Sequence, residues 1–313
     1  MSFEIILPFL RPIAGFLQDE HVSEIMVNPG GRVFIERHGR LQRVDDAVVD
    51  ERNLQVAVRN IARLLGSDIS EEQPILDARL PDGSRVAAVI PPCSLRGTAL
   101  TIRKFRPAYF SLEELVNVGT LSRAVADELT AAVGRRDNIL ISGGTGTGKT
   151  TLLNALTGCI GEDERVVVVE ETAELRIRLP NVVRLEERRA QRDLAAVTMR
   201  DLLRATLRHR PDRILIGEVR GGEAYDLLQA LNTGHAGALC TIHASSATQA
   251  LSRLASCVLQ SGVDLPYAAV RQQVGDAIQV VVHLQRREGR RSVTDVLAVA
   301  RYDAANDQYL TRR

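Results

Sequence analysis

The chain of 313 residues has no tryptophan, and aromatic residues make up only 4% of it. It has no apolar run of about 18 residues, so we expect no transmembrane helix. Its formal net charge is only +1, because 40 Lys and Arg nearly balance 39 Asp and Glu. Surfaces that bind nucleic acid are usually basic and often carry aromatic residues for stacking. The composition therefore argues against direct nucleic-acid binding.

Cysteine is also scarce and shows no metal-binding pattern. The four cysteines are far apart, without C-x-x-C spacing or clustered histidines: Cys93, Cys159, Cys240 and Cys257. This pattern favours free thiols in a reducing compartment over zinc ligands or disulfides. The first residues lack the basic segment and cleavage motif of a secretory signal. We therefore expect a cytoplasmic protein.

The most informative segment is GGTGTGKT at residues 143–150, which matches the pattern G-x-x-x-x-G-K-[ST]. It follows an apolar run at 138–141, which predicts a buried strand, and precedes a segment at 151–156 that favours a helix. Backbone N–H groups of such a loop and helix surround the β-phosphate of a nucleotide. We predict that the following residues contact ATP: Gly143, Gly144, Thr145, Gly146, Thr147, Gly148, Lys149, Thr150 and Thr151. Lys149 would reach the β- and γ-phosphates, and Thr150 would bind Mg²⁺.

A second apolar strand, predicted at 213–216, ends close to an acidic residue. It places Glu218 at a carboxyl end, where ligands bind in parallel sheets. Many phosphate-loop proteins have an aspartate at the position that Gly217 occupies here. We therefore expect Glu218 to serve the Mg²⁺ ion, the attacking water, or both.

The apolar run at 166–169 is also followed by acidic residues, namely Glu170, Glu171 and Glu174. Three carboxylates at one sheet edge repel one another unless a cation compensates them. The pattern predicts an Mg²⁺-ATP site with Glu170 among the metal ligands, although an acid-rich helix N-terminus would look the same. His243 follows a predicted strand at 238–242. Such a histidine either donates to a γ-phosphate or is an ordinary polar turn residue.

The order of predicted elements indicates an α/β protein with two domains. Residues 1–106 predict a small α+β domain, with helical spacing at 9–17 and 54–65 and strands at 25–28, 32–36, 40–44, within 78–89 and at 100–104. Residues 107–120 predict a linker. From residue 121 to 313, apolar strands alternate with helix-length segments, at 138–141, 165–169, 182–185, 213–216 and 238–242. This alternation predicts a mainly parallel sheet covered on both faces, with a hairpin of 277–284 and 291–300 at its edge.

Together these segments resemble the traffic ATPases of the type II and type IV secretion superfamily, nearest the Tad-pilus and conjugative-transfer branch. The resemblance covers almost the whole chain: the phosphate loop, an acidic box at 170–175, a Walker B-like segment at 214–220, a histidine box at 233–244, and N-terminal segments at 23–28 and 79–86. It implies a RecA-like ATPase domain and a hexameric ring. ATP would lie between the two domains, and its hydrolysis would power pilus assembly, secretion or conjugative transfer. It also implies inner-membrane platform proteins as partners and a place at the inner face of the cytoplasmic membrane.

The resemblance also assigns roles to single residues. Glu174 matches the acidic-box glutamate, Glu218 the Walker B glutamate and His243 the histidine-box residue, so with Lys149 they form the predicted catalytic set. Three arginines match the region that reaches the nucleotide phosphates in the family: Arg85, Arg96 and Arg103. Alternatively, each of these arginines is an ordinary strand residue whose side chain is solvated.

Two other functions remain open at this stage. One is a RecA-like motor acting on nucleic acid, against which the composition argues. The other is a nucleotide-gated structural ring with little turnover. The apolar segment at 5–17 either packs on its own domain or contacts lipid.

Overall fold

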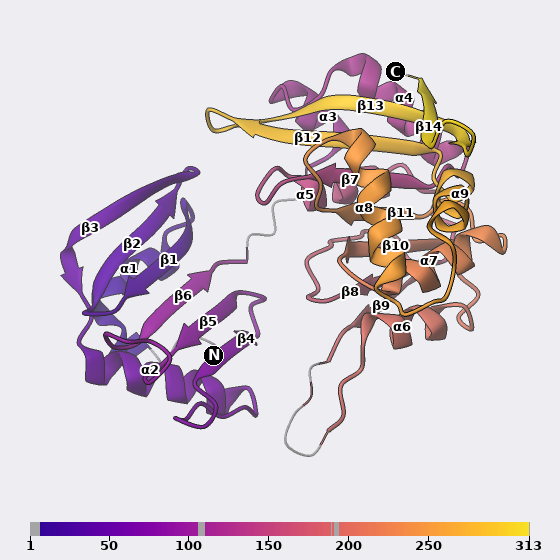
Figure 1. The fold of residues 1–313 in the computed structure, drawn as a ribbon. Coiled ribbons are helices and arrows are strands. Elements are labelled where there is room, and N and C mark those ends of the chain that lie inside the picture. The colour runs from indigo at the N-terminus through magenta and orange to yellow at the C-terminus, as the bar shows by residue number, and fades with distance from the viewer. Residues whose placement is uncertain (1–6, 106–109, 189, 191–193, 313) are drawn as a thin grey trace. The chain divides into compact units, whose positions relative to one another are not determined.

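A computed structural model describes residues 7–105, 110–188, 190 and 194–312. The chain divides into two compact units, Met1–Pro107 and Ala108–Arg313. Each unit has its own sheet and its own buried apolar core (Figure 1). No helix in the described part of the chain is long and apolar enough to cross a membrane.

The first unit is built on a six-stranded antiparallel sheet in the order β3-β2-β1-β6-β5-β4. Its strands are β1 (Val22–Asn28), β2 (Arg32–Arg37), β3 (Arg40–Val48), β4 (Ile75–Arg79), β5 (Arg85–Val89) and β6 (Ala99–Arg103). Helix α2 (Glu51–Leu64) begins at Asp50, whose side chain accepts from two backbone N–H groups. Leu54, Val58 and Ile61 of this helix are fully buried in the core of the unit. The pattern of short strands and one amphipathic helix matches the predicted α+β module.

The helix predicted at 9–17 is only partly correct. The segment forms two 3-10 turns, Leu7–Phe9 and Arg11–Ile13, and then a short α1 (Ala14–Gln18). Pro8 and Pro12 lack the backbone N–H that a continuous helix needs, which explains the interruption. The apolar side chains of this segment, Leu10, Ile13 and Leu17, are buried in the core of the first unit. These three residues therefore pack on their own domain, which is one of the two alternatives given above for the segment at 5–17.

The second unit contains an eight-stranded sheet in the order β14-β13-β12-β7-β11-β10-β8-β9. The six strands from β12 to β9 pair in parallel, and β13 and β14 add in antiparallel fashion. Its strands are β7 (Ile139–Gly143), β8 (Val166–Glu170), β9 (Val182–Glu186), β10 (Arg213–Val219), β11 (Leu239–Ile242), β12 (Val280–Arg287), β13 (Arg290–Asp303) and β14 (Gln308–Arg312). Its helices are α3 (Leu112–Asn117), α4 (Arg123–Gly134), α5 (Lys149–Thr157), α6 (Met199–Thr206), α7 (Glu223–Asn232), α8 (Ala247–Leu259) and α9 (Tyr267–Ala277). The predicted, mainly parallel α/β domain is confirmed.

Two predictions about segments need correction. Of the linker predicted at 107–120, residues 107–109 lie outside the described residues, and the rest contains α3, which contacts α4 and α5. Leu115 of α3 is buried in the core of the second unit, and Ser111 and Glu114 form a capping box at its start. The predicted C-terminal hairpin exists as β12 and β13, but it does not form the edge. The short strand β14, which the sequence pattern did not single out, continues the sheet beyond it.

Candidate nucleotide site

The glycine loop connects β7 to α5 at the carboxyl edge of the parallel sheet. Gly146 and Gly148 have φ angles of +70° and +98°, a region that favours glycine. A methyl group at Gly143 would lie 2.5 Å from the carbonyl oxygen of Leu284 and 2.6 Å from Oγ1 of Thr147. The glycines therefore permit a tight backbone turn that opens directly into the first turn of α5, where helix N–H groups are available to an anion.

Lys149 lies at the mouth of this loop. It is only 7% exposed, and its Nζ donates to the carbonyl oxygens of Gly143 at 3.1 Å and Gly144 at 3.0 Å. Burial lowers the pKa of Lys149, while the negative charge of Glu218 raises it in part. The ammonium group is thus held in a poorly solvated position where phosphate oxygens are strong partners.

The threonines predicted in the loop have different surroundings. Thr147 is buried and donates from Oγ1 to the carbonyl oxygen of Gly144 at 3.0 Å, which stabilises the loop itself. Thr145 is exposed, and Thr150 and Thr151 are half-buried in the first turn of α5.

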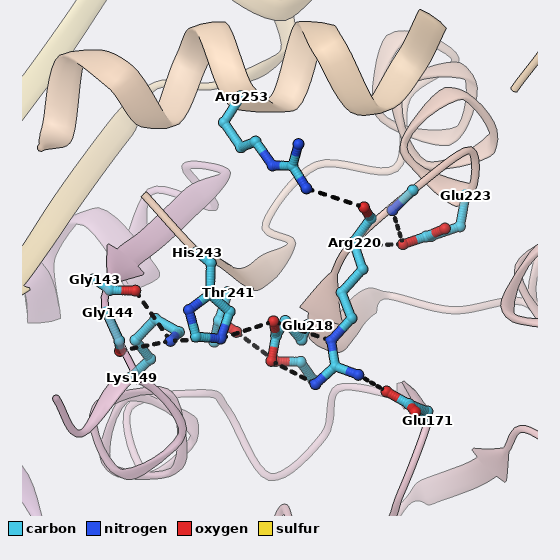
Figure 2. A network of polar contacts seen from close by, with 12 residues as sticks. Gly143, Gly144, Lys149, Glu171, Glu218, Arg220, Glu223, Thr241, His243 and Arg253 are labelled. Carbon is cyan, nitrogen blue, oxygen red and sulfur yellow. Dashed lines mark hydrogen bonds and ion pairs between the residues drawn. The ribbon is translucent and has the colours of Figure 1, made fainter. Parts of the chain in front are cut away.

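Glu218 and His243 meet Lys149 from two neighbouring strands. Glu218 is near the end of β10, and His243 directly follows β11, which lies between β10 and β7. Nε2 of His243 is 3.4 Å from Nζ of Lys149 and 3.0 Å from Oε1 of Glu218 (Figure 2). Three predicted catalytic residues from separate segments therefore come together in one line.

The imidazole in the middle of this line is held in its neutral form at neutral pH. Burial lowers the pKa of His243 first, and the positive charge of Lys149 lowers it further, while the carboxylate of Glu218 opposes both. A neutral imidazole has one N–H to donate and one nitrogen to accept with. Both contacts use Nε2, so this nitrogen either accepts from Lys149 or donates to Glu218, according to the tautomer.

Arg220 belongs to the same network, although our sequence analysis gave it no role. Its Nε is 3.1 Å from Oε1 of Glu218, its Nη2 is 3.2 Å from Oε2, and its Nη1 contacts Glu171 (Figure 2). These contacts hold the carboxylate of Glu218 from the side opposite His243. The available signal was its position two residues after Glu218, at the end of the Walker B-like segment 214–220.

The contacts of Glu170 speak against the metal-binding role predicted for it. It is 2% exposed, and its Oε1 accepts from the backbone N–H groups of Glu174 at 2.7 Å and Leu175 at 2.8 Å. Its Oε2 lies 3.2 Å from Nη2 of Arg184. Burial raises the pKa of Glu170, and these hydrogen bonds oppose that rise. Its carboxylate thus serves to order the chain that leads from β8 to the half-buried Glu174.

The position of Glu170 also accounts for Gly217. A methyl group at Gly217 would lie 3.1 Å from Cγ of Glu170. The stem of the glutamate therefore packs tightly against the position where many phosphate-loop proteins carry an aspartate.

Comparison with known proteins places most of the chain in one family. Residues 10–306 match the family described as "Type II/IV secretion system protein". The chain belongs to the type II/IV secretion system protein family. It is 37% identical over 299 residues to the conjugal transfer protein TrbB of Rhizobium radiobacter, covering 94% of this chain and 88% of the relative. It is 38% identical over 315 residues to the type IV secretion system protein PtlH of Bordetella pertussis, covering 92% of this chain and 93% of the relative.

A solved structure supports the same placement. The VirB11 ATPase from the Brucella suis type IV secretion system, in complex with sulphate, is 33% identical and matches with a TM-score of 0.51. The match covers 94% of each chain. The resemblance to secretion ATPases seen in the sequence is thereby confirmed.

In this secretion-family chain, the three arginines predicted to reach the phosphates all lie in the first unit. Arg85 on β5 and Arg103 on β6 are register partners, so their side chains leave the same face of the sheet. Arg103 also lies 3.7 Å from Glu24, and Arg96 is exposed in the connection between the two strands. The structure therefore pairs Arg85 with Arg103, while the role of all three in nucleotide binding remains a prediction.

Proposed function

We propose that this chain is a Mg²⁺-dependent ATPase that powers pilus assembly, protein secretion or conjugative transfer. The observation that carries the proposal is the line Lys149–His243–Glu218, which joins a phosphate-binding cation to a carboxylate at the edge of a parallel sheet. The names of the relatives, a conjugal transfer protein and a type IV secretion ATPase, point to the same work.

Each residue of the site would have its own role in ATP binding and hydrolysis. On ATP binding, Lys149 would exchange the carbonyl oxygens of Gly143 and Gly144 for phosphate oxygens. Glu218, helped by Glu174, would position the water that attacks the γ-phosphate. His243 would donate to a γ-phosphate oxygen and so connect the loss of that phosphate to Glu218. Arg220 would keep the Glu218 carboxylate in place through its two contacts.

Thr150 and Glu218 would hold a magnesium ion that enters with the nucleotide. Within the described ranges no group of three or more His, Cys, Asp or Glu residues is arranged to hold a metal. Mg²⁺ commonly takes one or two protein ligands and completes its octahedral shell with water and phosphate oxygens. Bound there, the ion would neutralise charge on the phosphates during transfer.

The working form we propose is a homohexamer at the inner face of the cytoplasmic membrane. Arg85, Arg96 and Arg103 would close over the phosphates, and phosphate release would let the two domains separate again. Inner-membrane platform proteins would receive this motion, with no direct contact to nucleic acid.

Paired substitutions test the catalytic assignment. Lys149→Ala should lower ATP affinity about 100-fold or more, because two charge-assisted hydrogen bonds are lost. Glu218→Gln should retain ATP but lower the hydrolysis rate about 100-fold or more, because the amide no longer acts as a base. The matched control is Glu128→Gln, an exposed glutamate on α4. Nucleotide binding and phosphate release are measured on all four proteins.

Two outcomes would replace the proposal. A native chain that binds ATP without turnover would favour the nucleotide-gated structural ring. Rapid turnover by Glu218→Gln would show that another group positions the water.

A further inference from the structure

The β12–β13 hairpin carries an unusual density of positive charge beside the glycine loop. Residues 286–291 read Arg-Arg-Glu-Gly-Arg-Arg. Strand β12 pairs in parallel with β7, and the pairing sets Leu284 opposite Gly143, the first residue of the loop. The charged end of the hairpin thus begins just where the phosphate-binding loop begins (Figure 1).

Two of the four arginines lie against the loop itself. A methyl group built on Gly146 would be 3.6 Å from Nη1 of Arg286, and one on Gly148 would be 3.5 Å from Cδ of Arg291. Arg286 and Arg291 are direct cross-strand partners, so they share one face of the hairpin. Arg287 and Arg290 form the next pair, and strand alternation places them on the opposite face.

The chemistry of these two side chains suits a polyanion. Planar guanidinium groups give phosphate oxygens charge-assisted, often bidentate hydrogen bonds. A nucleotide bound at the glycine loop would bring its phosphates beside the Arg286–Arg291 pair.

The sheet order indicates which part of a nucleotide this pair would meet. Strand β7 lies between β12 on one side and β11 and β10 on the other. Glu218 and His243, the groups assigned to the γ-phosphate, come from the β10 and β11 side. Arg286 and Arg291 come from the β12 side. The end of the nucleotide away from the γ-phosphate is therefore nearer to them.

We propose that Arg286 and Arg291 form a second cationic arm of the nucleotide site and contact the α-phosphate and ribose end of ATP and ADP alike. The assignment rests on the proposed function, since it concerns the same site. It makes the hairpin of the second unit part of nucleotide retention, independent of any arginine from the first unit.

The test uses two double variants of the full chain with the same loss of charge. Arg286→Gln with Arg291→Gln removes the pair next to the loop, and Arg287→Gln with Arg290→Gln removes the pair on the other face. Affinities for ADP and for a slowly hydrolysed ATP analogue are measured at fixed salt, and thermal unfolding checks that each variant is folded. The first variant should lose about 10-fold or more in affinity for both nucleotides. The second should stay within about threefold of the native chain.

Each other result has a distinct meaning. Equal losses of nucleotide affinity in both variants would show that only the overall positive charge of the hairpin matters, and would overturn the assignment. A loss for the ATP analogue but not for ADP would place the pair at the γ-phosphate and also overturn it. Failure of the native chain to bind either nucleotide would overturn the proposed function itself, whereas unchanged affinity in the first variant overturns only the role of the pair.

Discussion

Three side chains from three separate segments make the candidate site, and the charges of Lys149 and Glu218 both act on the ionisation of His243. Lys149 and Glu218 carry opposite charges, and His243 lies between them within 3.4 Å and 3.0 Å. Burial lowers the pKa of both Lys149 and His243, so solvent contributes less than usual to their protonation. The charge of one neighbour should therefore be visible in the titration of the next.

The imidazole of His243 offers a direct measurement of this coupling. Its pKa lies below the ordinary 6.5, so it loses its proton at a lower pH than a free histidine. Lys149→Met removes a positive neighbour and should raise the pKa of His243. Glu218→Gln removes the opposing negative charge and should lower it further. NMR titration of the imidazole C–H signals measures both, with His243→Gln to assign the resonance.

The control for this titration is Lys104→Met, which replaces the other lysine of the chain. Lys104 lies in the first unit, where it donates to the carbonyl oxygen of Asp19 at 2.8 Å. The pKa of His243 should not change in this variant. If Lys149→Met also left it unchanged, the contact line would not exist in solution.

At the level of elements, apolar runs in the sequence specify the parallel strands. The connections between the starts of neighbouring strands depend on hydrogen bonds of single polar residues. Asn138 is 4% exposed just before β7. Its Nδ2 donates to the carbonyl oxygen of Ala277 at 2.7 Å, and its Oδ1 accepts from the N–H of Ala238 at 2.9 Å. One side chain thus ties the start of β7 to the segments that precede β12 and β11. Our sequence analysis placed it inside the strand, since its distant partners are not visible in a local pattern.

Asn138→Ala should destabilise the second unit, because it leaves two buried backbone groups without these partners. Each such group costs about 1–3 kcal/mol, so we expect a loss of about 2–4 kcal/mol in the free energy of unfolding. Urea denaturation followed by far-UV circular dichroism measures it. Asn117→Ala, at an exposed position in α3, should change stability by less than about 0.5 kcal/mol. A small effect at both positions would show that water replaces the lost partners at residue 138.

At the level of the whole molecule, the chain has two units with separate cores, and the predicted phosphate-contacting residues are divided between them. The glycine loop, Glu218 and His243 belong to the second unit, and the arginine pair Arg85–Arg103 belongs to the first. If arginines complete the site in a ring, catalysis depends on assembly as well as on the fold of one chain.

Hydrolysis rate and mass should therefore depend together on protein concentration. We expect the specific ATPase activity to rise as hexamers form, and to stay lower by about 100-fold or more in Glu218→Gln at every concentration. Activity assays run in parallel with light scattering or mass photometry test this. Full activity in a monomer would show that one chain contains the complete site, and the ring mechanism would then be wrong for this protein.

The sequence by itself determined the α/β class and the glycine loop, and it placed Glu218 at the sheet edge where Lys149 lies. Apolar runs specify buried parallel strands, and the carboxyl ends of such strands meet at one edge. His243 joined this set only through the resemblance to secretion ATPases, because its position after a strand also suits an ordinary turn residue. Only the tertiary structure decided that Glu170 bonds to the backbone of Glu174 and Leu175, and that Arg220 holds Glu218. It also decided that the β12–β13 hairpin lies beside the glycine loop. These contacts depend on strand register and side-chain direction between segments far apart in the chain, and no local pattern of residues encodes either.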